Sequence, residues 1–296
     1  MKFVYSPRYG VDIGEHVFAT EKYAAVHDEL LKRGLAKTAD FIEPAMPPYT
    51  DFEEFLDPDY MYDLRIGRMT ERTAVSELPV KRDVIDAGFL AAEGTRLAAD
   101  IALKDGVCVH LGGGLHHAYP HHAEGFCYIN DLAYAIYRLK REGKIKAAVV
   151  IDCDLHQGNG TAFYFKDDPD VFTFSMHQEL NYPMPKEKSS LDVGLPDGAG
   201  DGEYLDALTG ALGKMFADGK TYDIALYQAG VDVYEHDQLG GLKLTMNGLK
   251  RRDEMVIGEC RKRGIPVAIT LGGGYPEDFA DLAALHTQTC EVAIRS

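Results

Sequence analysis

Short apolar runs alternate with longer amphipathic segments along most of the chain. The apolar runs have the length and residue types of buried strands, and the longer segments repeat apolar residues at helical spacing. The runs expected to form strands cover residues 2–6, 107–111, 147–151, 171–176, 223–228 and 265–271. The segments expected to form helices cover residues 20–33, 51–62 with an interruption near Pro58, 83–104, 130–142, 161–165, 201–217, 245–263 and 276–294. This alternation predicts an α/β fold with a doubly wound, mainly parallel sheet and helices on both faces.

Two segments show neither pattern. Residues 63–82 have little periodicity, and we expect a surface loop there, near the rim of any site. Three arginines of this segment are expected to form a solvated face: Arg65, Arg68 and Arg72. Residues 177–202 are expected to be a long irregular excursion, and loops of that length are often functional. No repeat or linker divides the chain, so residues 1–296 are expected to form a single domain.

Polar residues stand directly after two of the apolar runs. GGGLHHA (112–118) follows the first, and Asp152, Asp154 and His156 follow the second. Alternation along an extended segment puts these three side chains on one face. A carboxylate and an imidazole there can hold a divalent ion if a third ligand joins them, and Asp152 can orient a nearby imidazole. The alternative is an ordinary turn with solvated acids.

Two further runs end in the same way. Asp232 follows the run 223–228, and Tyr275 follows three glycines after the run 265–271. Taken singly, Asp232 is compatible with a loop cap and Tyr275 with simple packing. Ligand sites of open parallel sheets, however, form beyond the carboxyl ends of the strands. Four polar strand ends are therefore expected to share one site.

The residues at these ends have the chemistry of amide hydrolysis. Asp154, His156 and Asp232 can hold a metal that lowers the pKa of water and polarises a carbonyl. His117 is suited to take a proton from water and return it to the leaving amine. Tyr275 can donate a hydrogen bond where the carbonyl oxygen becomes negative.

Five motifs, in chain order, resemble those of the histone deacetylase family. They are GGGLHHA, EGFCYIND (124–131), DCDLHQGNG (152–160), the segment around Asp232, and LGGGY (271–275). The resemblance covers nearly the whole chain and implies the arginase–deacetylase fold. HQGNG, NYP (181–183) and DQLGGL (237–242) are most similar to the class IV, histone deacetylase 11-like branch and its bacterial relatives.

The resemblance implies a role for each matching position. Zinc would be bound by Asp154, His156 and Asp232, with Fe²⁺ as an alternative metal in the cell. His116 and His117 match the tandem histidines, of which the second is the main general base and acid, and Tyr275 matches the transition-state tyrosine. Substrate contacts would come from Gly125, Phe126, Tyr182, Gly273 and Gly274. A structural K⁺ or Na⁺ would be held by Asp152, Asp154, His156, Ser175 and Met176.

The chain departs from the family pattern at two places. Asn159 stands where most members have an aspartate that supports the second histidine, and a neutral partner stabilises an imidazolium less. The pH profile of His117 is therefore expected to differ. The rim aspartate that clamps peptide backbones in many eukaryotic members has no match within 63–82. His121 and His122 continue the histidine-rich run and are expected to be rim or surface residues.

Composition narrows the partners. A net charge of −16 without a long basic block argues against nucleic-acid binding. No apolar run reaches membrane-spanning length and MKFVYSPRYG lacks a signal-peptide core, so we expect a cytoplasmic protein without membrane contact. The five cysteines form no CxxC pair, and we expect reduced, buried thiols.

Together these features predict a zinc-dependent hydrolase that removes an acyl group from N-acyl-lysine, in a protein or peptide, or from a similar small acylated amine. An acetylpolyamine amidohydrolase is the main alternative. A two-metal ureohydrolase would need a second D-x-D, which Asp232-Val233-Tyr234 lacks, and a non-enzymatic binding module would be expected to have lost a ligand or the tyrosine. Long acyl groups are removed in the branch that the motifs resemble, so we hypothesise that they are cleaved at least as well as acetyl. The sequence leaves the oligomeric state open.

Overall fold

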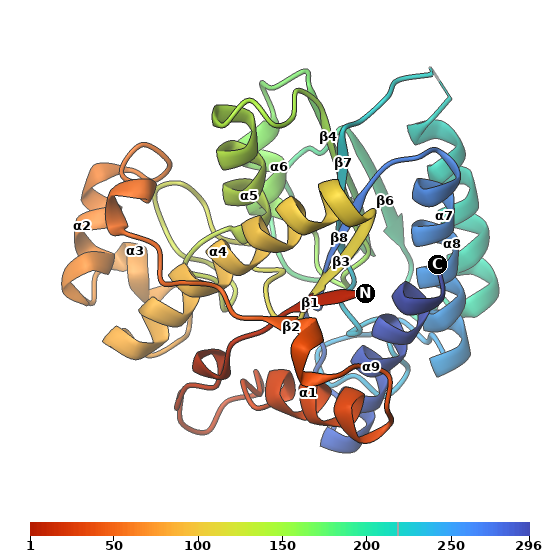
Figure 1. The fold of residues 1–296 in the computed structure, drawn as a ribbon, viewed down its shortest axis with the longest axis horizontal. Helices are drawn as coiled ribbons and strands as arrows, with labels where there is room; N and C mark the ends of the chain where they lie inside the picture. Colours follow the sequence, from red (N-terminus) through yellow and green to blue (C-terminus); the bar gives the residue numbers. More distant parts are fainter. Residues whose placement is uncertain (218) are drawn as a thin grey trace.

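One parallel sheet organises the molecule. The structure, a computed structural model, describes residues 1–217 and 219–296. Within these residues, eight strands form one sheet in the order β2–β1–β3–β8–β7–β4–β5–β6, and every neighbouring pair is parallel (Figure 1). The expected doubly wound parallel sheet is confirmed.

The elements follow the predicted order, with two additional strands, β2 and β6, and one additional short helix, α3, in the described part of the chain. The strands are β1 Lys2–Val4, β2 Phe41–Ile42, β3 Val107–His110, β4 Ala148–Asp152, β5 Val171–Gln178, β6 Leu191–Leu195, β7 Ile224–Gln228 and β8 Val267–Thr270. The α-helices are α1 Lys22–Lys32, α2 Pro58–Ile66, α3 Glu71–Ala74, α4 Arg82–Asp105, α5 Asp131–Arg141, α6 Asn159–Phe165, α7 Asp201–Met215, α8 Met246–Lys262 and α9 Phe279–Arg295. Short 3₁₀ turns occur at Pro7–Tyr9, Thr38–Asp40 and Tyr49–Phe52.

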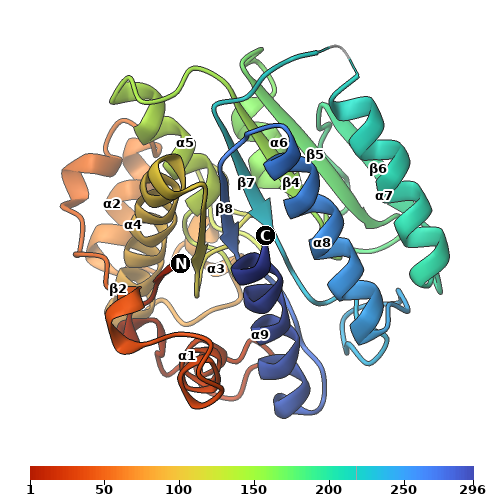
Figure 2. The same ribbon diagram turned by 45° about the vertical axis from the view of Figure 1, so that its right-hand side comes forward.

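The sheet separates two apolar cores. Successive side chains of a strand point to opposite faces, and the central strands β4 and β7 are buried along their whole length. In β4, Val149 and Ile151 pack into the core that α1, α7, α8 and α9 cover, whereas Val150 packs into the core under α4 and α5. Figure 2 shows the strands between these two groups of helices. Burial on both faces explains why the central strands are continuous apolar runs.

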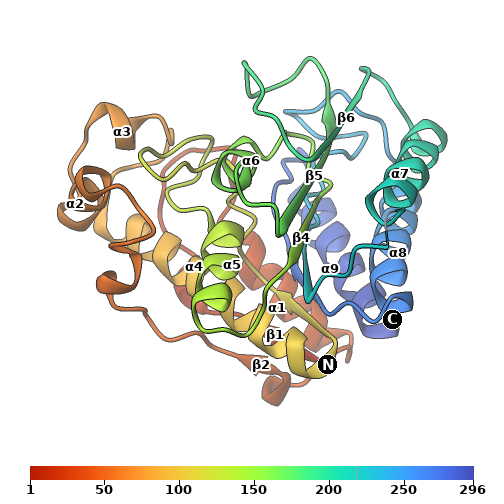
Figure 3. The same cartoon turned by 90° about the horizontal axis from the view of Figure 1, so that it is seen from above.

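A third, aromatic cluster joins residues 52–64, which include most of α2, to α4 and α5. The ring of Phe52 stacks on Tyr134 at a centroid distance of 4.1 Å and meets Phe89 edge-on at 4.7 Å. Helices α2 and α3 thereby form a lobe at the end of the molecule opposite α7 and α8, as Figures 1 and 3 show. This lobe carries the loop that borders the site.

The expectation of a surface loop at 63–82 is wrong in part, because α2 and α3 both lie in this region. The Asp57 side chain accepts two backbone N–H groups at the start of α2, and Pro58 occupies its first turn. Gly67 ends the helix in the left-handed conformation, with φ 65°. Pro58 therefore begins a helix, whereas the sequence pattern favoured one over 51–62.

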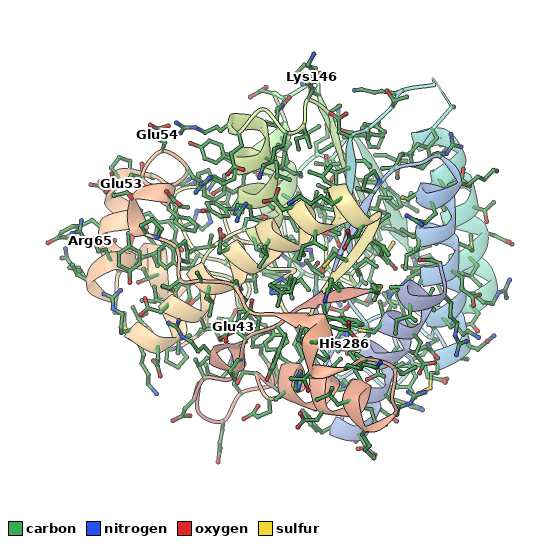
Figure 4. The ribbon with its side chains drawn as sticks, viewed as in Figure 1. Glu43, Glu53, Glu54, Arg65, Lys146 and His286 are labelled. Atoms are coloured by element: carbon green, nitrogen blue, oxygen red, sulfur yellow. The ribbon has the colours of Figure 1, made fainter. Side chains whose placement is uncertain are left out.

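The arginines of this region differ in their surroundings. Arg65 and Arg68 are exposed, as expected, and Arg65 projects from the periphery of the lobe in Figure 4. Arg72 is partly buried, and its guanidinium donates to the buried Asp63 carboxylate at 3.0 Å. Arg72 thus ties α3 to α2 through Asp63, although 42% of its side chain remains exposed to solvent.

The segment 177–202 also contains regular structure that the sequence pattern did not indicate. β6 pairs with β5 at the edge of the sheet, and its residues alternate between partly buried and exposed. An edge strand faces less of the core, so LDVGL keeps polar residues and lacks the apolar run of a central strand. The two-residue strand β2 closes the other edge and is too short to give a pattern.

None of the helices in the described part of the chain combines the length and apolar character needed to cross a membrane. All five cysteines are buried and free. Burial accounts for the expected reduced thiols, and it raises the pKa of Cys108 and of Cys153 to about 12, which leaves both protonated and unreactive.

Candidate active site

Four adjacent central strands bring the polar residues together. The order β3–β8–β7–β4 places their carboxyl ends side by side, as Figure 2 shows. Asp152 is the last residue of β4, and Asp154 and His156 stand in the loop that follows it. The other groups stand in the loops that follow β3, β7 and β8. The expected sharing of one edge by these strand ends is therefore observed.

Asp154, His156 and Asp232 form a buried cluster. One potential ligand atom of each lies within 4.8 Å of the others. His156 Nδ1 lies 3.3 Å from Asp154 Oδ1 and 3.2 Å from Asp232 Oδ2. The backbone N–H groups of Leu155 and Gly273 donate to Asp232 Oδ1 and Asp154 Oδ2, at 2.8 and 3.0 Å. These donors hold the carboxylates in place.

The cluster fits a divalent transition metal. Two carboxylate oxygens and one imidazole nitrogen are a donor set that zinc accepts, with a coordination position left for water or substrate. In the metal-free chain, burial raises the pKa of Asp232 to about 6, reinforced by the nearby Asp154. Burial disfavours charge on His156, but Asp154 and Asp232 outweigh it and raise its pKa to about 10. A protonated imidazole thus supplies the positive charge that the two carboxylates require when no metal is bound.

Close approach of the backbone at Gly273 leaves room for this cluster. A Cβ at that position would overlap the Asp232 carboxylate and lie 2.8 Å from Asp154 Oδ2. Gly273 was expected to contact substrate. The structure places it against the carboxylates of the cluster, and neighbouring Gly274 against Val231 and Leu282.

The two adjacent histidines have different partners. His116 Nδ1 lies 2.7 Å from Asp152 Oδ2, so Asp152 orients an imidazole as the sequence indicated. Burial disfavours the charged form of His116, but Asp152 and Asp154 raise its pKa to about 9. His117 Nδ1 lies 2.7 Å from Asn159 Oδ1. Its pKa is lowered well below the usual value, first by burial and then by the positive charges of His116 and His156. At neutral pH the first imidazole is charged and the second is neutral.

Tyr275 is fixed at the same cluster through its backbone. Its N–H donates to Asp237 Oδ2 at 2.7 Å, and its carbonyl accepts from the backbone of Gln238 at 3.1 Å. The ring is buried and meets Phe126 edge-on at 6.0 Å. Burial, followed by the charges of Asp232 and Asp154, raises the pKa of the phenol well above its usual value. The hydroxyl therefore stays protonated and can donate a hydrogen bond.

A narrow pocket of about 180 Å³ leads from the surface to these groups. Its lining residues are Glu77, His117, Gly125, Phe126, His156, Asn181, Tyr182, Leu239 and Tyr275. Gly125 has φ 48°, and a Cβ there would lie 2.6 Å from His117 Cδ2, so only glycine leaves this wall open. Tyr182 is the most exposed of the aromatic lining residues at 37%, and its ring centroid lies 5.1 Å from that of His117. The predicted substrate residues Gly125, Phe126 and Tyr182 are thus together.

Two of the residues expected to hold a monovalent cation, Asp154 and His156, belong to the cluster, and the other three lie on β4 and β5. Asp152 pairs with Ser175 in the register of β4 and β5, and Met176 is buried beside them. Ser175 Oγ is hydrogen-bonded to His177 Nδ1 at 2.9 Å. A K⁺ or Na⁺ site at these residues remains a prediction.

The sequence pattern did not indicate a role for three ionisable residues of the site. Glu77 lines the mouth of the pocket with φ 62°, so the segment 63–82 places a carboxylate at the rim although it has no match to the family's rim aspartate. Glu124 accepts hydrogen bonds from Asn159 and Tyr182. Lys22 is fully buried, and its Nζ donates to the Gly272 carbonyl at 2.6 Å. Glu124 is the first residue of a recognised motif, and Glu77 lies in the irregular segment 63–82. A lysine in the amphipathic α1 carries no signal of burial.

The histone deacetylase domain family model matches residues 16–290. An uncharacterized protein of Picosynechococcus sp. is 39% identical over 286 residues, which cover 96% of this chain and 95% of that protein. Histone deacetylase 2 of Arabidopsis thaliana is 29% identical over 279 residues, 91% of this chain and 72% of that one. The acetoin utilization protein AcuC of Bacillus subtilis is 29% identical over 272 residues, 83% of this chain and 69% of that one.

Solved structures show the same likeness. The crystal structure of a histone deacetylase homolog from Aquifex aeolicus is 26% identical with a TM-score of 0.85, and covers 99% of this chain and 83% of that one. A histone deacetylase homolog complexed with SAHA is 25% identical, with a TM-score of 0.84 and the same coverage. The resemblance predicted from the motifs is confirmed for the family, and the assignment to the class IV-like branch stays a prediction. With a family match over most of its length and a site built at the matching strand ends, the chain belongs to the histone deacetylase domain family.

Proposed function

We propose that the protein is a metal-dependent deacylase that hydrolyses the amide bond between an acyl group and a lysine side chain or a similar primary amine. One observation carries the proposal. A charged and a neutral histidine, with a protonated tyrosine, surround a buried Asp-His-Asp cluster at the end of a narrow pocket. Groups whose surroundings push their pKa values apart are the usual acid and base of an active site.

Asp154, His156 and Asp232 would hold the metal, and zinc suits this donor set. A divalent ion held there supplies Lewis acidity, which lowers the pKa of water and polarises an amide carbonyl. His116 and Asp152 lie beside these ligands, and the charged imidazole adds a positive field at the reacting atoms.

Neutral His117 is the group that moves the proton. Its Nδ1 is occupied by Asn159, so Nε2 is the nitrogen that can take a proton from the attacking water and pass it to the leaving amine. Tyr275 donates its hydroxyl proton in a hydrogen bond to the carbonyl oxygen as negative charge develops. Protonation of the amine lets it leave as the free lysine side chain.

The shape of the pocket suits an alkyl stem that carries the amide at its tip. Phe126 and Tyr182 supply aromatic surface along the pocket, and Glu77 at its mouth can accept a main-chain N–H of a peptide. Every peptide offers that N–H group whatever its side chains. We therefore propose that acyl-lysine is accepted with little dependence on the flanking sequence.

An apolar pocket next to the site supports acceptance of longer acyl groups. It has a volume of about 50 Å³ and shares Phe18, Gly113, Leu115 and Phe126 with the lining of the metal cluster's own cavity. Methylene groups gain about 0.8 kcal/mol each when they leave water for such surroundings. We propose that acyl chains longer than acetyl are cleaved at least as well as acetyl.

The test is kcat/KM for the zinc-loaded protein with acetyl-, octanoyl- and myristoyl-lysine in two unrelated peptides, with acetylputrescine alongside. We expect turnover of acyl-lysine in both peptides, and its loss in Asp232→Asn, which removes a ligand. Strong preference for acetylputrescine would favour the polyamine alternative, and strict dependence on flanking residues would remove the proposed role of Glu77. Absence of turnover with every amide would contradict the function.

A further inference from the structure

The side-chain amide of Asn159 lies between His117 and Glu124. Asn159 Oδ1 is 2.7 Å from His117 Nδ1, and its Nδ2 donates to Glu124 Oε1 at 2.6 Å. An asparagine amide has nearly the same shape in its two orientations, so its hydrogen-bond partners decide which end faces which neighbour. Here one neighbour is a histidine, which can donate or accept at Nδ1, so it does not by itself set the orientation, whereas the other neighbour is a carboxyl group.

Glu124 is suited to set it, because an ionised carboxylate accepts hydrogen bonds and cannot donate them. Burial disfavours the charge of Glu124, but hydrogen bonds from His122, Tyr182 and Asn159 outweigh it and lower the pKa of the carboxyl. The amide must then turn its NH₂ towards Glu124 and its oxygen towards His117. An oxygen facing Nδ1 requires a proton on Nδ1, which leaves Nε2 of a neutral imidazole without one.

The carboxylate itself is held from several sides. Tyr182 Oη donates to Oε1 at 2.9 Å, and His122 Nε2 lies 3.1 Å from Oε2. The Glu124 backbone exchanges hydrogen bonds with Cys127, with N–O distances of 3.0 and 2.9 Å. The side chain is 21% exposed, so water competes only in part for its oxygens. Because donors from three other residues converge on it, Glu124 keeps its position when nothing occupies the pocket.

We propose that Glu124 is a positioning residue that fixes the amide of Asn159 and, through it, the Nδ1-protonated tautomer of His117. Its effect on turnover rests on the proposed deacylase function, in which His117 Nε2 must be free to accept a proton. Glu124 also places a full negative charge one amide away from His117. Asn159 carries no negative charge, but Glu124, to which it is hydrogen-bonded, does.

Moving the carboxylate from position 124 to position 159 tests whether Glu124 orients the Asn159 amide or only stabilises the loop. Glu124→Gln keeps the size of the side chain but offers both a donor and an acceptor, so both orientations of Asn159 become available. Asn159→Asp alone puts a second carboxylate within hydrogen-bond distance of Glu124, where two like charges disfavour each other. The double variant Glu124→Gln with Asn159→Asp again has one carboxylate, and the carboxylate introduced beside His117 can only accept from Nδ1.

The first measurement is turnover. We expect each single variant to lower kcat about tenfold, the low end of what loss of a residue behind a catalytic group costs, with KM little changed. The double variant is expected to recover most of the wild-type kcat. Glu187→Gln, whose carboxylate accepts from Tyr119 at 3.2 Å and makes no contact with Glu124, serves as the control with unchanged kcat. Losses in the single variants that multiply in the double variant would contradict the proposal.

The second measurement does not depend on turnover. Two-bond ¹H–¹⁵N spectra of ¹⁵N-histidine-labelled, zinc-loaded protein report the tautomer of His117, assigned by the signal that His117→Ala loses. We expect Nδ1–H in the wild type, a mixture of tautomers in Glu124→Gln, and Nδ1–H again in the double variant. An Nδ1–H tautomer that persists in Glu124→Gln would overturn the inference. A wild-type protein without any deacylase activity would sink the proposed function, and this spectrum would still decide the role of Glu124.

Discussion

At the scale of single residues, the site gives two neighbouring histidines different charge states, one positive and one neutral. Asp152 beside His116 stabilises an imidazolium, whereas Asn159 beside His117 supplies no charge of its own. The proximity of charged His116 further disfavours a proton on His117. His116 therefore supplies a positive electrostatic field, and His117 supplies a ring nitrogen without a proton, although the two residues are adjacent in the sequence.

Tyr275 is expected to act on the reaction and not on the fold. The residue is held by its backbone contacts with Asp237 and Gln238, and its hydroxyl is not needed to anchor the ring. Tyr275→Phe should therefore bind metal normally and unfold at the same temperature, while kcat falls about 10²–10³-fold, as for loss of one oxyanion donor. Steady-state kinetics with metal analysis checks this, and near-normal kcat in a folded variant would remove Tyr275 from the mechanism.

Metal uptake is expected to release a proton. In the metal-free chain the pKa of His156 is raised to about 10 and that of Asp232 to about 6. Between these values a metal must displace the proton of His156, so affinity should rise about tenfold for each unit increase in pH. Titration calorimetry in buffers of different ionisation enthalpy should find about one proton released per ion near neutral pH. Affinity that does not change across this range would contradict the assignment of His156 as a ligand.

At the scale of elements, the loop after β8 must lie close to the ends of β4 and β7. Gly273 has no positive φ, so space alone limits its replacement. Gly273→Ala is expected to weaken zinc binding roughly 10–100-fold, because its Cβ would displace the Asp232 carboxylate. Gly210→Ala in α7, where a Cβ meets nothing within 4 Å, is the matched control and should bind zinc normally. Equal zinc affinity in both variants would show that the carboxylates tolerate the shift.

The sequence indicated those elements that carry a strong local pattern. β4 and β7 are buried on both faces and therefore read as unbroken apolar runs, and their ends revealed Asp154 and Asp232. β6 gave no clear pattern because an edge strand needs few apolar residues, and the interruption predicted near Pro58 is the start of α2. Glu124 stood inside a recognised motif, but its role depends on contacts with Asn159 and Tyr182, which only the folded chain brings near.

At the scale of the whole molecule, the buried Arg252 of α8 ties a covering helix to the floor of the site. Its guanidinium donates to the carbonyls of Cys153 and Ala229, both at 3.3 Å, and pairs with Asp253 at 2.8 Å. These carbonyls belong to the loops that follow β4 and β7. The helix layer therefore holds two of the strand ends that carry the proposed metal ligands.

Arg252→Met is expected to lower the free energy of unfolding by about 3–5 kcal/mol, because it leaves Asp253 as a buried charge without its cation. Lys250→Met on the same helix is the control. Lys250 forms an exposed i,i+4 pair with Glu254 at 3.7 Å, and its loss should cost less than about 1 kcal/mol. Urea unfolding of both variants measures the difference. Similar costs would mean that Arg252 is not required to hold the two loops.

The number of metal ions that turnover requires tests the proposed mechanism as a whole. Among the described residues, one group of three side chains has the arrangement of a metal site: Asp154, His156 and Asp232. Metal-depleted protein should be inactive towards acyl-lysine, and its activity should rise linearly with added zinc up to one ion per chain and then level off. Acyl-lysine turnover that is unaffected by metal removal, or two tightly bound manganese ions per chain in the active protein, would contradict a single-metal deacylase.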